Sequence, residues 1–174
     1  MNHTTNKFRW FWAWDDEREE AWLSQMAAQG FHLVSPNPFG YYTFCQGEPR
    51  QVAYRLDYAT SRYSTAEYYQ LFQDAGWEHV GQMGGWQYWR KPIPSGQVAP
   101  EIFTDNESKI QKYRRQLGVL VIALPIILVI LNNLSLRERT WALEALIFIE
   151  FLIAVLLSYA ILRLALRIRA LQRR

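Results

Sequence analysis

Cysteine and histidine are scarce in this 174-residue chain, which has one Cys and three His. Cys45 alone cannot form an intramolecular disulfide or a cysteine metal cluster. His3, His32 and His79 stand in no catalytic or zinc-binding pattern, and the chain has neither a phosphate-binding Walker loop nor a dinucleotide glycine fingerprint. We therefore expect no metal, no cofactor and no catalytic residue, and predict that the protein is not an enzyme.

Charge is absent from residues 117–134, LGVLVIALPIILVILNNL. As a helix rising about 1.5 Å per residue, this stretch reaches roughly 27 Å, close to the ~30 Å hydrocarbon core of a bilayer. A second apolar stretch, residues 141–166, is longer and carries Glu144 and Glu150. Together the two stretches predict a two-helix transmembrane hairpin.

The positive charges around the hairpin are unevenly placed. They precede the first stretch and follow the second, whereas the loop between them holds only Arg137 and Arg139. The positive-inside rule then predicts a two-pass protein with the N-terminus and the C-terminus in the cytoplasm. The basic tail fits contact with the lipid bilayer, and we expect no nucleic acid partner. The N-terminal residues show no secretory signal pattern.

The first 99 residues are slightly acidic and rich in aromatic side chains. They hold eight Lys and Arg against ten Asp and Glu, with seven of the eight Trp and eight of the ten Tyr. A surface that binds single-stranded nucleic acid also uses aromatic rings, but it needs a basic groove. This composition instead favours an aromatic core or an aromatic ligand pocket.

The same order of elements occurs twice in this part of the chain. Strand periodicity, helix-capping residues and glycine stops predict a strand, a helix and two strands over 7–14, 16–29, 31–35 and 41–45, and again over 51–59, 65–75, 77–82 and 86–91. Three pairs have capping-box spacing and predict helix starts: Asp16 with Glu19, Ser64 with Glu67, and Thr104 with Glu107. The predicted fold is α+β: duplicated strand–helix–strand–strand units forming an antiparallel sheet with two helices on one face, followed by the two-helix transmembrane hairpin.

The predicted domain boundaries follow from these patterns. They are a cytoplasmic α+β domain over 1–92, a linker over 93–103, a juxtamembrane helix over 104–116, transmembrane helices over 117–134 and 141–166, an extracytoplasmic loop over 135–140 and a basic cytoplasmic tail over 167–174. No Gly or Pro separates the juxtamembrane helix from the first span, so the two are expected to form one helix.

Aromatic and charged residues on the predicted strands suggest a ligand site. Trp10, Trp12 and Trp14 share one side of the first strand, and Arg55 and Asp57 share one side of the strand 52–58. Aromatic walls with a few convergent charges suit a hydrophobic or cationic small ligand. Burial of the same rings in the core is the alternative, and the sequence does not decide between them.

Glu150 is the second candidate, because an acidic residue within a membrane span is costly unless it is protonated or paired. In an antiparallel hairpin it lies about level with Pro125, which cannot donate a hydrogen bond to the carbonyl of Val121. We predict that protonated Glu150 donates to this carbonyl and fastens the hairpin. A proton relay is the alternative.

The segments GFHLV, FGYYTF, YRLDY, AGWEHVGQMGGWQYWRK and EIFTDNESK resemble domain-of-unknown-function family 2812 of Gram-positive bacteria. The resemblance covers residues 7 to about 115. It implies a bacterial membrane protein with no transferable catalytic residues, and genes beside PadR-like regulators imply sensing or regulation. The order of elements is also similar to that of GyrI-like ligand-binding domains, by topology only.

The function we expect is therefore a membrane-anchored cytoplasmic module that binds a ligand or a protein and acts as a sensor or regulator. The alternative is a structural or assembly subunit of a larger membrane complex. A regulatory or membrane protein partner fits either hypothesis.

Overall fold

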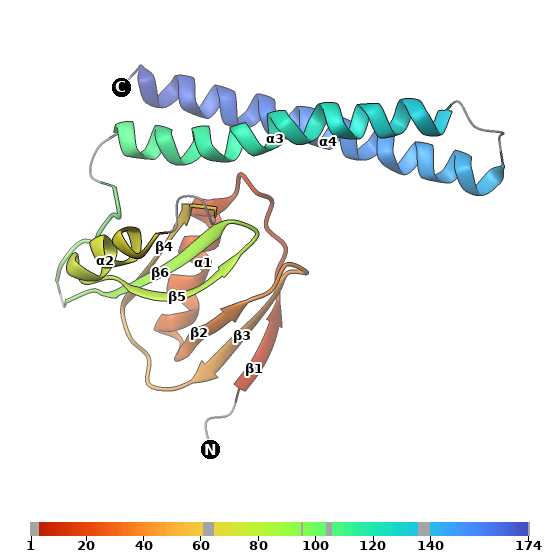
Figure 1. Ribbon diagram of the computed structural model, residues 1–174. Helices are drawn as coiled ribbons and strands as arrows, with labels where there is room; N and C mark the ends of the chain where they lie inside the picture. The colour runs from red at the N-terminus through yellow and green to blue at the C-terminus, as the bar shows by residue number, and fades with distance from the viewer. Residues whose placement is uncertain (1–3, 61–64, 95, 104–105, 136–139, 174) are drawn as a thin grey trace. The chain divides into compact units, whose positions relative to one another are not determined.

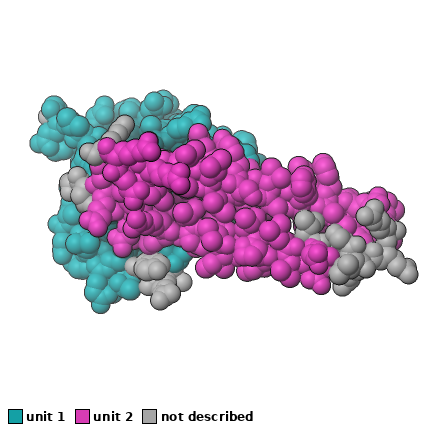
Figure 2. Space-filling view, turned by 90° about the horizontal axis from the view of Figure 1, so that it is seen from above, with its two compact units in different colours: residues 1–105 teal, residues 106–174 magenta. Residues whose placement is uncertain are grey.

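The computed structural model describes residues 4–60, 65–94, 96–103, 106–135 and 140–173. The chain divides into two compact units, Met1–Asp105 and Asn106–Arg174, which are coloured separately in Figure 2. Each unit is described by itself.

The first unit contains the predicted order of elements twice (Figure 1). The first half consists of β1 (Thr4–Phe8), α1 (Asp16–Ala28), β2 (Phe31–Pro36) and β3 (Tyr41–Gln46). The second half consists of β4 (Val52–Tyr58), α2 (Ala66–Asp74), β5 (Glu78–Met83) and β6 (Trp86–Pro92). The α+β class and the doubled strand–helix–strand–strand unit are thus confirmed.

The strands form two antiparallel three-stranded sheets, in the orders β1-β3-β2 and β4-β6-β5, and this corrects the expectation of one sheet. β2 and β5 contact each other, but each has a register shift at the equivalent place, at Val34 and at Val80. A bulge interrupts the regular row of hydrogen-bonding groups. Pro36 of β2, which has no N–H, packs against Gly81 of β5. β2 and β5 therefore contact each other without forming a hydrogen-bonded strand pair, and the two sheets stay separate.

The two helices contact opposite faces of the second sheet, which corrects the prediction that they share one face. Successive residues of a strand point to opposite faces, and in β6 both Tyr88 and Trp89 are fully buried. Tyr88 belongs to the larger core together with Leu23 of α1, whereas Trp89 stacks on Phe72 of α2 with ring centroids 4.5 Å apart. This sheet is apolar on both faces, so each face requires its own cover.

Helix α1 also covers the outer edge of β4. The N–H of Tyr54 donates to Ser24 Oγ at 3.2 Å, and the N–H of Leu56 donates to Glu20 Oε1 at 2.8 Å. Residues four apart on a helix repeat about every 6 Å, which matches the ~6.6 Å between alternate residues of a strand. An open edge of the sheet is thereby closed by side chains of the first half.

The first strand is shorter than predicted. β1 ends at Phe8, and residues 9–14, expected to continue a buried strand, leave the sheet. Phe11 of this segment turns toward the core, where its ring lies 5.6 Å from that of Trp22. β1 is an edge strand with one neighbour, so its far side offers no surface to bury more rings.

The capping predictions have mixed outcomes. Asp15 rather than Asp16 stands at the N-cap of α1, and Thr65 caps α2 by accepting the N–H of Tyr68 at 3.3 Å. Ser64 and Thr104, the other predicted caps, lie outside the described residues.

The second unit is a pair of long apolar helices, α3 (Asn106–Ser135) and α4 (Trp141–Gln172), which run side by side (Figure 1). Both are long and apolar enough to cross a membrane. α3 is continuous from residue 106 through Pro125, so the juxtamembrane helix and the first span form one helix as expected. α4 extends beyond residue 166 and includes the start of the basic tail.

Candidate functional site

The three predicted tryptophans form a ladder of contacting rings at the surface. The rings of Trp10 and Trp12 meet edge to face at 5.7 Å, and those of Trp12 and Trp14 stack at 5.4 Å. Trp10 is 53% exposed and Trp12 is 41% exposed. Trp10 and Trp12 are therefore not part of the core, and solvent or a ligand can reach them, whereas Trp14 is half-buried.

Arg55 and Asp57 lie together on β4 but are occupied by other side chains. Arg55 donates to Glu101 at 2.8 Å and forms an ion pair with Glu20 at 3.8 Å. Asp57 is buried and accepts the hydroxyl of Tyr68 at 3.0 Å. Neither residue lines the cavity that Trp12 lines. A ligand role for the set of five residues stays a prediction.

Trp12 lines a cavity of about 250 Å³ near the start of α1. Its walls come from the segment after β1, the first turns of α1, the β2–β3 turn and the β5–β6 turn. They are formed by Phe11, Trp12, Ala13, Asp16, Glu19, Pro38, Met83, Gly84 and Trp86. The cavity thus combines three aromatic rings with two carboxyl groups.

Glu19 is the central polar group of this cavity. It is 5% exposed, and its Oε1 accepts hydrogen bonds from the hydroxyls of Tyr42 at 2.8 Å and Tyr88 at 2.6 Å. Tyr42 belongs to β3 and Tyr88 to β6, so one carboxyl group joins the two sheets. Because Glu19 is almost fully buried, its surroundings in the protein set its charge state.

The protonation of this cluster is shifted by its surroundings. Burial raises the pKa of Glu19; the hydrogen bonds from Tyr88 and Tyr42 oppose the rise, and the nearby charge of Asp16 adds to it. Burial, followed by the charge of Glu19, raises the pKa of Tyr42 and of Tyr88. Both tyrosines therefore stay protonated and donate hydrogen bonds throughout the physiological pH range. An added positive charge in the cavity would stabilise the ionised form of Glu19.

Sequence reasoning missed Asp16 and Glu19 as site residues, because it assigned them to a helix cap. A signal was present: positions 16, 19, 20, 23, 26 and 27 are all buried and follow the spacing of one helix face. Three acidic residues continue the apolar stripe of Leu23, Met26 and Ala27. An acidic residue at a stripe position indicates a buried, partnered carboxyl group.

His32 and His79 each form a hydrogen bond. His32 pairs through Nε2 with the carbonyl of Glu48 at 2.8 Å, and His79 with Gln87 Oε1 at 2.9 Å. His3 lies outside the described residues. No group of three or more potential metal ligands occurs in the part of the chain that the structure describes.

The intramembrane pairing of Glu150 stays a prediction. Its Oε2 is buried and, within the described residues, has no hydrogen-bond partner. Pro125 lies inside α3, and Val121 is 50% exposed. The proposed bond to the Val121 carbonyl is absent from the hydrogen bonds among these residues, and a buried carboxyl oxygen still requires a partner.

The fold and the cavity define a class of protein: a doubled α+β domain with an aromatic, acidic cavity, joined to two helices able to span a membrane. The chain belongs to the family described as "Protein of unknown function (DUF2812)", whose model matches residues 15–124. The match covers all of the doubled unit except β1, and extends into α3. No curated protein and no solved structure matches the chain.

Proposed function

We propose that this protein is a membrane-anchored sensor or regulator whose cytoplasmic domain binds a small cationic ligand with an apolar body. The observation that carries the proposal is the buried carboxyl group of Glu19 at the wall of an aromatic cavity. The ligand would enter between Phe11, Trp12 and Trp86 and place its positive charge toward Glu19 and Asp16.

The energetics favour a cation over a neutral or anionic ligand. A carboxylate removed from water is unstable unless charge or hydrogen bonds compensate it. The tyrosine hydroxyls compensate Glu19 only in part, because its pKa remains raised. A cation would restore the ionised state, and aromatic faces would add cation–π attraction of about 0.5–2 kcal/mol.

The orientation in the membrane belongs to the same proposal. The distribution of Lys and Arg around the two spans supports a two-pass protein of a bacterial cell membrane with both termini in the cytoplasm. Reporter fusions after Gln172 and within residues 135–140 would be read on the inner and outer side respectively. The opposite pattern would place the domain outside the cell.

A matched pair of probes tests the ligand class. Choline and its uncharged carbon analogue 3,3-dimethylbutan-1-ol would be titrated into the full-length protein in a neutral detergent, with tryptophan fluorescence as the signal. Choline should change the emission saturably because Trp12 and Trp86 line the cavity. The neutral analogue should bind about tenfold more weakly or not at all, as expected for the loss of one charge contact.

Two variants localise the effect. Glu19→Gln keeps the size of the side chain and should weaken choline binding about tenfold. Glu17→Gln removes the same charge from an exposed position of the same helix and should leave binding unchanged. Equal binding of the charged and neutral probes, or equal affinity of wild type and Glu19→Gln, would contradict the proposal.

A further inference from the structure

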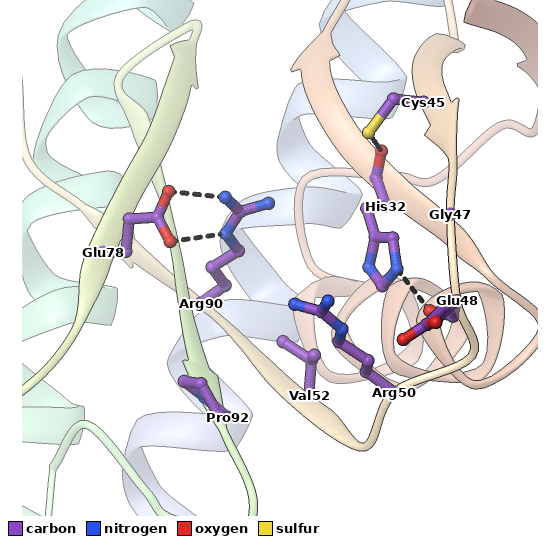
Figure 3. Close-up of a pocket in the computed structure, with 9 residues that line it drawn as sticks. All are labelled: His32, Cys45, Gly47, Glu48, Arg50, Val52, Glu78, Arg90 and Pro92. Carbon is purple, nitrogen blue, oxygen red and sulfur yellow. Dashed lines mark hydrogen bonds and ion pairs between the residues drawn. The ribbon is translucent and has the colours of Figure 1, made fainter. Parts of the chain in front are cut away.

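A second cavity, of about 370 Å³, lies where the two halves of the domain meet (Figure 3). The first half contributes β2, β3 and the connection that follows β3, and the second half contributes β4, β5 and β6. The lining residues are His32, Cys45, Gly47, Glu48, Arg50, Val52, Glu78, Arg90 and Pro92. This cavity shares no lining residue with the aromatic cavity around Glu19.

Arg90 of β6 is held in place by Glu78 of the neighbouring strand β5. Its Nε donates to Oε2 at 2.8 Å, and its terminal NH2 group donates to Oε1, so both oxygens of Glu78 are engaged. The hydrogen bond from Arg90 lowers the pKa of Glu78, and Glu78 in turn raises the pKa of Arg90. This ion pair orients the guanidinium. The hydroxyl of Tyr54 on β4 also interacts with it.

Arg50 belongs to the connection between β3 and β4. Its main-chain N–H donates to the carbonyl of Ala27 at 3.1 Å, which fixes the backbone at this point. Its guanidinium has no hydrogen-bond or ion-pair partner among the residues that the structure describes. Figure 3 shows the side chains of Arg50 and Arg90 reaching into the same opening, one from each half of the domain.

The carboxylates at the opening do not neutralise Arg50. Glu78 is bound by Arg90, and Glu48 contributes its main-chain oxygen to His32 but forms no ion pair with Arg50 in the described structure. Glu78 compensates the charge of Arg90, so Arg50 is the guanidinium at this opening whose charge has no ion-pair partner within the described residues. Guanidinium groups match the oxygens of carboxylate and phosphate in shape and charge.

We infer that this cavity binds a small anionic ligand, a carboxylate or a phosphate, between Arg50 and Arg90. Val52 and Pro92 supply apolar surface for the body of the ligand. The site takes the opposite charge from the Glu19 cavity and uses none of its residues, so either site can fail without the other.

The single cysteine of the chain provides a local readout, because half-buried Cys45 lines this cavity. Full-length protein in a neutral detergent would be treated with iodoacetamide, and the alkylation rate would be followed by mass spectrometry while inorganic phosphate or benzoate is added. Bound anion should slow the alkylation of Cys45 saturably. No slowing by either probe up to about 10 mM, tenfold weaker than a Kd of 1 mM, would overturn the inference.

Two variants in the connection between β3 and β4, one that removes a positive charge and one that removes a negative charge, test whether the cavity binds an anion. Arg50→Gln should raise the half-effect concentration about tenfold, and Glu48→Gln should lower it or leave it unchanged. Both side chains are exposed, so both variants should fold. Arg18→Gln on α1, outside the cavity, is the control for net charge and should match the wild type. Unchanged protection in Arg50→Gln, or loss of protection in Glu48→Gln, would refute the assignment.

The source of the anion is settled in the same assay. Nanodiscs of phosphatidylglycerol and of phosphatidylcholine would be compared without added probe. Protection of Cys45 by the anionic lipid alone assigns the ligand to a lipid headgroup, and protection only by dissolved phosphate or benzoate assigns it to a free metabolite.

Discussion

Replacing Gly30 by alanine should destabilise the first unit much more than the same change at Gly76. The two glycines end α1 and α2 at equivalent places in the doubled unit, with φ of 85° and 81°. Gly30 donates its N–H to the carbonyl of Ala27, and Gly76 donates to that of Gln73, at 3.0 and 2.8 Å. Their backbone conformations are therefore matched, and only their surroundings differ.

The surroundings set the magnitude. A left-handed conformation costs an alanine about 1–2 kcal/mol at either site. At Gly76 the added Cβ would lie 3.4 Å from the Lys91 side chain, which is flexible and can move. At Gly30 it would lie 2.5 Å from the carbonyl oxygen of Gly47, so the backbone must shift. That shift strains the hydrogen bond from Gly47 N–H to Gly30 O, 2.9 Å long, whose loss would cost about 0.5–1.5 kcal/mol more.

The difference is measurable by thermal unfolding. For a domain of this size, about 1 kcal/mol changes Tm by roughly 4–8 °C. Near-ultraviolet circular dichroism of the full-length protein in detergent would follow the tryptophans, seven of which lie in the first 99 residues. Gly30→Ala should unfold about 5 °C or more below Gly76→Ala. Equal decreases would show that the close approach of Gly47 has no energetic importance.

Three further predictions concern acidic side chains with buried oxygen atoms. Glu20→Gln retains an acceptor for the N–H of Leu56, whereas Glu20→Leu does not. The Leu variant should therefore be less stable than the Gln variant by about 1–3 kcal/mol in thermal unfolding. Equal Tm values would show that Glu20 does not stabilise the edge of β4. Burial raises the pKa of Glu19 above its usual 4.5, so folding favours the protonated form. The stability of the wild type relative to Glu19→Gln should therefore fall as pH rises from 4.5 through the raised pKa. A stability difference that stays constant between pH 4 and 8 would contradict this prediction. Glu150→Gln should preserve association of the hairpin helices and Glu150→Leu should weaken it, and identical insertion and association would remove the hydrogen-bonding role.

Much of the fold could be predicted because short sequence patterns show where each helix and strand of the doubled unit begins and ends. Glycines at helix ends, paired aromatic strands and long uncharged stretches locate the elements by local chemistry. The division into two sheets could not be predicted, because it depends on whether β2 and β5, which lie in different halves of the repeat, pair or only contact each other. The opposite placement of the helices was partly visible, because consecutive Tyr88 and Trp89 predict a strand buried on both faces.

The candidate site was less accessible to sequence reasoning. Trp12 was singled out by its type and does line a cavity, but the carboxyl groups beside it were attributed to capping. A cap and a buried acid look alike in sequence, because both place Asp or Glu in the first helical turns. The partners that distinguish them, Tyr42 and Tyr88, lie 23 and 69 residues away from Glu19. Arg50 gave no signal, since its importance comes from lying opposite Arg90.

The covering of β4 by α1 makes the second half of the domain structurally dependent on the first. At the positions of α2 equivalent to Glu20 and Ser24 stand Ala66 and Gln70, so the second half has no matching device to offer the first. If the second half were expressed alone, the N–H groups at the outer edge of β4 would have no partner. Such an open edge strand can pair with other chains and cause aggregation. The two halves share one topology, but only the second half needs side chains of the other half to cover the edge of its sheet.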